Sequence, residues 1–134
     1  MIIVALDPGG TVGFAYQTSG SLGYGEVKSD RTWQLLDKLE PDILVAERFV
    51  HRRVEYFDPT PIEVIGVIKE WARQHNMPVV WQTAHQGKHF FTDARLKERG
   101  RYVVGKPHAR DAIRHLLYYQ EFGKSKAPGE ARKR

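Results

Sequence analysis

Short, continuously apolar runs recur along the chain and are separated by longer amphipathic segments. The runs lie at residues 2–6, 43–46 and 79–81, and their lack of polar alternation is typical of strands buried on both faces of a sheet. Residues 12–16 and about 22–27 follow the first run after turns rich in Gly, Ser and Thr, so they predict two further strands. Because short turns join the first three strands, we expect them to form an antiparallel meander.

Segments with helical spacing of apolar residues connect the later strands. Residues 33–39 form one of them, with Ser29, Asp30 or Thr32 as a candidate N-cap and Pro41 as its end. The remaining segments are, in chain order, a polar loop at 48–61, a helix at 62–74 that stops at Asn76, a short helix with basic flanks within 88–102, and a helix that opens at Pro107 and runs through Leu117.

This order of elements predicts an α/β fold with a mixed central sheet flanked by helices. The meander supplies antiparallel strands, and strands joined through helices should run parallel with right-handed crossovers. Functional sites in such sheets gather beyond the carboxyl ends of the strands. Two apolar runs end there on an acid, the first on Asp7 and the second on Glu47.

Asp7 stands at the mouth of the first predicted hairpin. Gly9 and Gly10 follow it, and we expect them to supply a positive φ or a close backbone approach in the turn. A carboxylate at the edge of the core is costly to bury unless it is paired or coordinates a metal ion.

The last helix adds a second polar pair near its N-terminus. His108 and Asp111 are spaced i, i+3 and so share one helix face, while Ala109 and Ala112 are small enough to let the helix lie close to the sheet. Asp7, Glu47, His108 and Asp111 could therefore converge. Such a set suits Mg²⁺ or Mn²⁺, and two ions can activate a water and stabilise the leaving oxygen of a phosphodiester.

Each of these four residues also has a simpler explanation. Asp7 could cap the turn, Glu47 could pair with Arg48 or Arg53, Asp111 could interact with the helix dipole, and His108 could be an ordinary hydrogen-bonding residue.

Composition favours an anionic partner. The 134 residues include 21 Lys and Arg against 16 Asp and Glu, a formal charge of +5, which fits nucleic acid, although solubilising surface charge is the alternative. The absence of cysteine excludes disulfides and thiolate metal sites. No apolar run approaches the roughly 20 residues of a membrane span, and we expect a cytoplasmic protein of a prokaryote or of a phage-infected cell. Residues 1–123 are predicted to form one domain, followed by a basic, disordered tail at 124–134.

The motifs resemble those of the RuvC-type Holliday junction resolvases of the ribonuclease H-like superfamily. The matching pieces are Ala5-Leu6-Asp7-Pro8-Gly9 with Thr11 and Gly13, Val45-Ala46-Glu47, and His108-x-x-Asp111-Ala112. Their order and spacing match from Met1 to about Tyr119, in a chain shorter than typical cellular members and compatible with a phage-borne version.

This resemblance implies a homodimer that cuts four-way DNA junctions symmetrically with divalent metal. It makes Asp7, Glu47 and Asp111 the metal-binding acids and puts His108 at a fourth catalytic position, where some relatives have an acid. It also implies that the segment after the second acid approaches the junction centre, where an aromatic side chain can stack on an unpaired base.

Basic and aromatic residues near these motifs are candidates for DNA contact, because cations bind phosphates and aromatic rings stack on bases. The candidates after Glu47 are Arg48, Phe49, Arg52, Arg53 and Tyr56, with Phe57 next, and those flanking the last helix are Lys88, which the resemblance supports, and Lys106. Phe49 could instead be a core residue, and the lysines could belong to a solvated surface.

Several other functions remain open. The alternatives are a nuclease acting on RNA–DNA hybrids, a nucleic-acid-binding module without catalysis, and an ATPase, for which the chain leaves little room for a second phosphate-binding lobe. Paired cuts need two active sites, and the helix at 62–72 is equally suited to a dimer interface or to the core.

Overall fold

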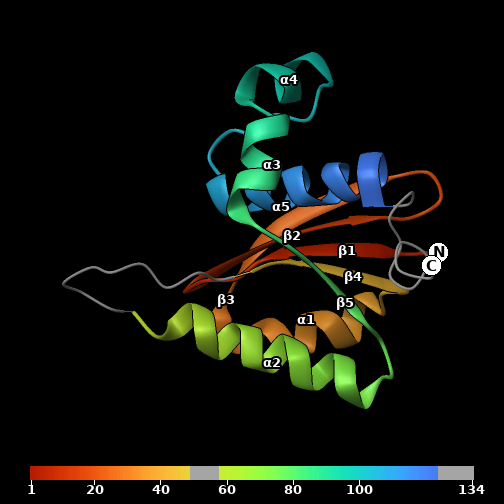
Figure 1. Ribbon diagram of the computed structural model, residues 1–134, viewed down its shortest axis with the longest axis vertical. Coiled ribbons are helices and arrows are strands. Elements are labelled where there is room, and N and C mark those ends of the chain that lie inside the picture. Colours follow the sequence, from red (N-terminus) through yellow and green to blue (C-terminus); the bar gives the residue numbers. More distant parts are fainter. Residues whose placement is uncertain (49–57, 124–134) are drawn as a thin grey trace, which may run out of the picture.

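A computed structural model of the protein describes residues 1–48 and 58–123 (Figure 1). Its centre is a five-stranded sheet with the strand order β3-β2-β1-β4-β5. The strands are β1 (Ile3–Asp7), β2 (Thr11–Gln17), β3 (Leu22–Lys28), β4 (Ile43–Glu47) and β5 (Val79–Gln82). β1, β2 and β3 form an antiparallel meander, whereas β1 pairs with β4, and β4 with β5, in parallel. The predicted mixed α/β sheet is therefore confirmed.

Helices cover both faces of this sheet (Figure 1). On one face, α1 (Thr32–Leu39) and α2 (Thr60–Gln74) pack over Val4 and Leu6 of β1. On the other face, α5 (Pro107–Tyr118) packs over Ile3 and Ala5. Because successive strand residues point to opposite faces, covering both faces buries every residue of β1, which explains its unbroken apolar run.

The start of α1 differs from the sequence prediction. A short 3₁₀ turn, η1 (Ser29–Arg31), precedes it, and Arg31 occupies the N-cap position without a side-chain cap. Thr32 is the first helical residue, and its hydroxyl donates to the carbonyl of Ser29 at 2.7 Å. None of the three candidate residues is the N-cap of α1. Ser29 and Asp30 belong to the 3₁₀ turn, and Thr32 already belongs to the helix. The helix ends at Leu39 with Glu40 as its C-cap, before Pro41, as predicted.

α2 begins two residues earlier than its apolar spacing predicts. Pro61 lies in its first turn, where a missing N–H costs nothing. Ile68 and Trp71 are core residues, whereas Ile62 is 46% exposed. The helix is thus part of the core, and its role in a dimer interface stays a prediction.

Two helices, rather than one, occupy the region around residues 88–102. α3 (Ala84–Phe90) starts at a capping box between Thr83 and Gln86. α4 (Asp93–Glu98) starts at Thr92, whose hydroxyl accepts from the N–H of Arg95 at 3.3 Å. The buried ring of Phe91 anchors the break between them, so capping and packing together override a continuous helix.

α5 lies directly on β2. It opens at Pro107 as predicted, and Ala109 and Ala112 are fully buried in the contact. The closest approach is at Gly13, where an added Cβ would lie 1.9 Å from the carbonyl oxygen of His108. The helix continues into a π turn, η2 (Tyr119–Gly123).

The expectation that Gly9 or Gly10 adopts a positive φ is wrong. Among the described residues, Gly100 and Gly105 are the glycines with positive φ, and Gly10 has no atom within 4 Å of an added Cβ. An added Cβ at Gly9 would lie 3.3 Å from the carbonyl oxygen of Thr11. The backbone of the turn therefore comes moderately close to Gly9, as the second expectation for these glycines states.

No helix in residues 1–48 and 58–123 is long and apolar enough to cross a membrane. The predicted disordered tail at 124–134 lies outside the described residues.

Candidate active site

Asp7 and Glu47 end two adjacent parallel strands at the same edge of the sheet. The register pairs Leu6 with Ala46, so the two acids follow side by side. Asp7 is 8% exposed. Its pKa is raised from 3.8 to about 8, first by burial, then by the charges of Glu47 and Asp111 and by a hydrogen bond with Glu47, while Lys88 opposes the shift. Three carboxylates therefore act on one another at this edge.

α5 presents its polar face to the two strand ends. His108, Asp111 and His115 follow the i, i+3, i+7 spacing of a single helix face. The Nδ1 atom of His108 lies 3.5 Å from Oδ2 of Asp7, and its side chain is 47% exposed. The structure thus brings together the four residues that the sequence suggests as catalytic, and their catalytic roles stay predictions.

Glu26 on β3 holds the beginning of this helix. Its Oε2 accepts from the backbone N–H of His108 at 2.9 Å and of Ala109 at 3.2 Å. A carboxylate at a helix N-terminus satisfies free N–H groups and interacts favourably with the helix dipole. It fixes where α5 starts, and with it the position of His108.

Asp111 is flanked by two cations. Nη1 of Arg114 donates to its Oδ1 at 2.7 Å, and Nζ of Lys88 lies 3.6 Å from its Oδ2. Arg114 also donates to the carbonyl of Phe91 at 2.7 Å and to the carboxylate of Asp93. One buried guanidinium therefore ties α5 to the break between α3 and α4 and orients Asp111.

Glu47 contacts a histidine. Nε2 of His115 lies 2.8 Å from its Oε1, whereas the guanidinium of Arg48 lies 5.9 Å from the centroid of the Trp81 ring. The suggested pairing of Glu47 with Arg53 involves a residue outside the described ranges.

The candidate DNA contacts fall into two groups. Arg48, Lys88 and Lys106 are exposed, Lys88 on α3 beside Asp111 and Lys106 at the N-cap of α5. The others, Phe49, Arg52, Arg53, Tyr56 and Phe57, lie outside the described residues.

Four residues of the site were missed by sequence reasoning, namely Glu26, Gln82, Arg114 and His115. His115 carried a signal, because it lies seven residues after His108 on the same helix face. Glu26 and Gln82 carried none, since each reaches the site only through the pairing of its strand.

The donor set fits a hard divalent cation. In the part of the chain that the structure describes, no three His, Asp or Glu side chains are arranged as a ready-made metal site. However, Asp7, Glu47 and Asp111 offer carboxylate oxygens, and Asp7 is buried among negative charges that disfavour its ionised form. A divalent cation would relieve that repulsion, and Mg²⁺ and Mn²⁺ prefer such ligands.

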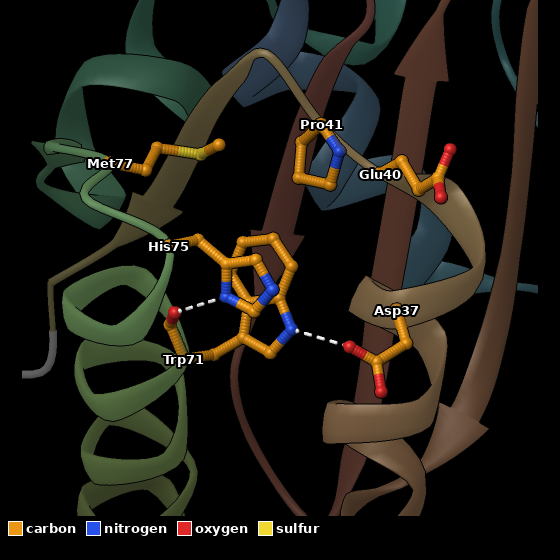
Figure 2. Close-up of a pocket in the computed structure, with 6 residues that line it drawn as sticks. All are labelled: Asp37, Glu40, Pro41, Trp71, His75 and Met77. Atoms are coloured by element: carbon orange, nitrogen blue, oxygen red, sulfur yellow. Dashed lines mark hydrogen bonds between the residues drawn. The ribbon is translucent and has the colours of Figure 1, made fainter.

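A cavity of about 530 Å³ lies at the other end of the sheet, between the last turns of α1 and α2 (Figure 2). The indole of Trp71 donates to Asp37 at 2.9 Å, and the ring of His75 stacks on it with centroids 3.8 Å apart. These residues precede β4 and β5, whereas the acids lie where β1 and β4 end, so the cavity is separate from the carboxylates.

Solved structures share this architecture. RuvC from Thermus thermophilus in complex with a Holliday junction substrate superposes with a TM-score of 0.70 at 18% identity, over 92% of this chain and 96% of that one. This chain has the RuvC fold. A second T. thermophilus RuvC structure matches with a TM-score of 0.61 at 19% identity, over 92% and 97% of the two chains. These matches confirm the fold expected from the sequence, a mixed sheet with helices on both faces.

A more distant match is YeaZ from Pseudomonas aeruginosa, with a TM-score of 0.51 at 17% identity over 75% of this chain and 52% of that one. No family model and no curated protein matches the sequence.

Proposed function

We propose that the protein is a metal-dependent endonuclease that resolves four-way DNA junctions by paired, symmetric phosphodiester cleavage. The observation that carries the proposal is the convergence of Asp7, Glu47 and Asp111 at one edge of a RuvC fold. The charge of +5 and the junction bound by T. thermophilus RuvC support DNA as the partner.

The three carboxylates and His108 would hold Mg²⁺ or Mn²⁺, two ions per site. When bound, the ions supply the positive charge that activates water and stabilises the leaving oxygen. Asp7 ends the fully buried strand β1, which would hold its carboxylate in place to bind an ion. His108 is half exposed beside Asp7, where its imidazole can bind an ion or accept a proton from water.

Paired cuts require two active sites, and we propose that a two-fold symmetric homodimer provides them. The partly exposed side of α2 around Ile62 is a candidate for the interface.

A substrate panel tests this function. We expect the purified protein with Mg²⁺ to cut a synthetic four-way junction into two nicked duplexes, and to leave linear duplex and RNA–DNA hybrid intact. Without Mg²⁺ it should bind the junction without cutting it.

Two other outcomes would support the rival functions. Cleavage of the hybrid in preference to the junction would indicate a ribonuclease H activity, which requires similar acids. Metal-independent binding without any cleavage would indicate a binding module.

Lys88 provides a prediction about DNA affinity. Its side chain is 60% exposed and its ammonium group lies beside Asp111, so it can reach a phosphate near the acids. We expect Lys88→Ala to weaken junction binding for every sequence and to reduce the slope of log affinity against log salt by about 1. Fluorescence anisotropy at several salt concentrations measures both effects.

Lys38→Ala is the matched control, because Lys38 is exposed on α1 on the opposite face of the sheet. Equal salt slopes for the Lys88 and Lys38 variants would show that Lys88 contacts no phosphate.

A further inference from the structure

We infer that His115 is a positioning residue for Glu47. Its imidazole donates a hydrogen bond to the Glu47 carboxylate and so holds it in one orientation for metal binding. Gln82 contacts the other nitrogen of the ring and fixes the ring in turn. The inference rests on the proposed metal site and assigns the support of one of its ligands.

The contacts of the ring leave it no freedom. His115 is 2% exposed, its Nε2 lies 2.8 Å from Oε1 of Glu47, and its Nδ1 lies 2.7 Å from Oε1 of Gln82. Glu47 ends β4 and Gln82 ends β5, and the two residues are register partners in the parallel ladder. The imidazole thus bridges the ends of two neighbouring strands from the helix above them.

The direction of the bond to Glu47 follows from its chemistry. If Nε2 carried a lone pair, that lone pair would face a carboxylate oxygen, so Nε2 must carry the proton and donate it. Nδ1 then donates to Oε1 of Gln82 or, if the oxygen and nitrogen of the Gln82 amide are exchanged, accepts from its NH₂ group. Both arrangements leave Glu47 as the acceptor.

Helix α3 closes the remaining side of the ring. A Cβ added to Gly87 would lie 3.2 Å from Cε1 and Nδ1 of His115, so the glycine lets α3 pack directly against the imidazole. A ring enclosed by α3, α5 and two strand ends cannot rotate without moving one of them.

Fixing Glu47 matters because a metal ligand must be oriented before the ion binds. A free Glu side chain has several rotamers, and ordering it costs conformational entropy at the moment of binding. Groups that hydrogen-bond to a metal ligand typically contribute 10–100-fold to metal affinity or activity. The same helix face therefore does two things: His108 approaches the acid of β1, and His115 holds the acid of β4.

Mn²⁺ binding without DNA tests the inference. We expect His115→Leu, which fills similar volume but has no donor, to weaken Mn²⁺ binding about 10–100-fold in calorimetric titration. His115→Gln should restore most of the affinity, because its amide can donate to Glu47. The metal concentration for half-maximal junction cleavage should shift in the same order, while the rate at saturating Mn²⁺ changes much less.

Two further variants separate positioning from folding. His75→Ala removes a ring packed on Trp71, far from the acids, and should lower the melting temperature without changing Mn²⁺ affinity. Gln82→Met frees the far side of the imidazole, and should weaken Mn²⁺ binding even if His115→Leu does not fold. Parent-like Mn²⁺ affinity in Gln82→Met, or in a folded His115→Leu variant, would overturn the inference.

The outcomes also distinguish this inference from the proposed function. If the parent protein binds Mn²⁺ but cuts no junction, weaker binding in the variants supports the role of His115 while the resolvase function fails. If the parent cuts junctions and the variants keep its metal dependence, the function stands and the inference fails. If the parent neither binds Mn²⁺ nor cuts, both are wrong.

Discussion

We expect Asp7→Asn to abolish junction cleavage, with a loss of roughly 10³-fold or more, because Asp7 is the buried carboxylate next to which both Glu47 and Asp111 lie. Asparagine keeps the size of the side chain and removes the charge that an ion needs. Junction binding should stay close to that of the parent, since the basic residues are untouched. Single-turnover cleavage and anisotropy on the same junction measure the two effects.

The same substitution should stabilise the metal-free protein. The pKa of Asp7 is raised to about 8, so the folded state holds a proton there that the unfolded chain loses near pH 3.8. With EDTA present, the parent protein's free energy of unfolding therefore falls as pH rises from about 4 to about 8. Asp7→Asn removes this loss, so in EDTA at pH 8 it should be more stable than the parent, and its free energy of unfolding should change less between about pH 4 and about pH 8.

Mg²⁺ should then raise the melting temperature of the parent and leave that of Asp7→Asn nearly unchanged, since bound ligand stabilises only the state that binds it. Undiminished cleavage by Asp7→Asn would remove Asp7 from the active site. A melting temperature that rises equally with Mg²⁺ in both proteins would place the ion elsewhere.

Gly13→Ala is expected to have the largest effect on stability. An added Cβ would lie 1.9 Å from the carbonyl oxygen and 2.1 Å from the carbonyl carbon of His108, which are backbone atoms in the first turn of α5. The helix must move away from β2, and overpacking of this kind costs about 3 kcal/mol. We expect the melting temperature to fall by on the order of 10 °C and cleavage to drop, because His108 moves with the helix.

Gly66→Ala is the matched control. Gly66 is exposed in the middle of α2, with no atom within 4 Å of an added Cβ, and alanine is the better helix former. It should raise the free energy of unfolding by up to about 1 kcal/mol, and this control is compared by stability alone, because Gly66 lies on the side of α2 proposed for the dimer interface. Equal stability of Gly13→Ala and the parent would show that α5 does not lie this close to β2.

The sequence by itself determined the architecture and the place where the candidate site residues meet. Apolar runs at 2–6, 43–46 and 79–81 predicted the strands that became β1, β4 and β5, because burial on both faces leaves no place for polar alternation. An acid directly after such a run has to lie at the sheet edge, so Asp7 and Glu47 were found from order alone. The spacing of His108 and Asp111 put both on one helix face for the same local reason.

Local sequence patterns failed to predict where one helix ends and the next begins, and where two elements lie against each other. The region around 88–102 contains one stretch of helix-compatible residues, yet capping by Thr83 and Thr92 and the burial of Phe91 divide it into α3 and α4. The glycines after Asp7 suggested an unusual turn backbone, whereas the glycine that matters is Gly13, through its contact with α5. A sequence shows which residues are small, but not which backbone will lie against them.

Only the tertiary structure decided what holds the acids in place. Glu26, Gln82, Arg114 and His115 lie 21 to 83 positions from the partners they reach in other elements, and strand order, register and the crossing of α5 over the sheet bring them together. Periodicity reports which face a residue occupies within one element, over a few turns or strand positions. Distances between elements depend on how whole faces pack, and that packing places His115, and not Arg48, against the carboxylate of Glu47.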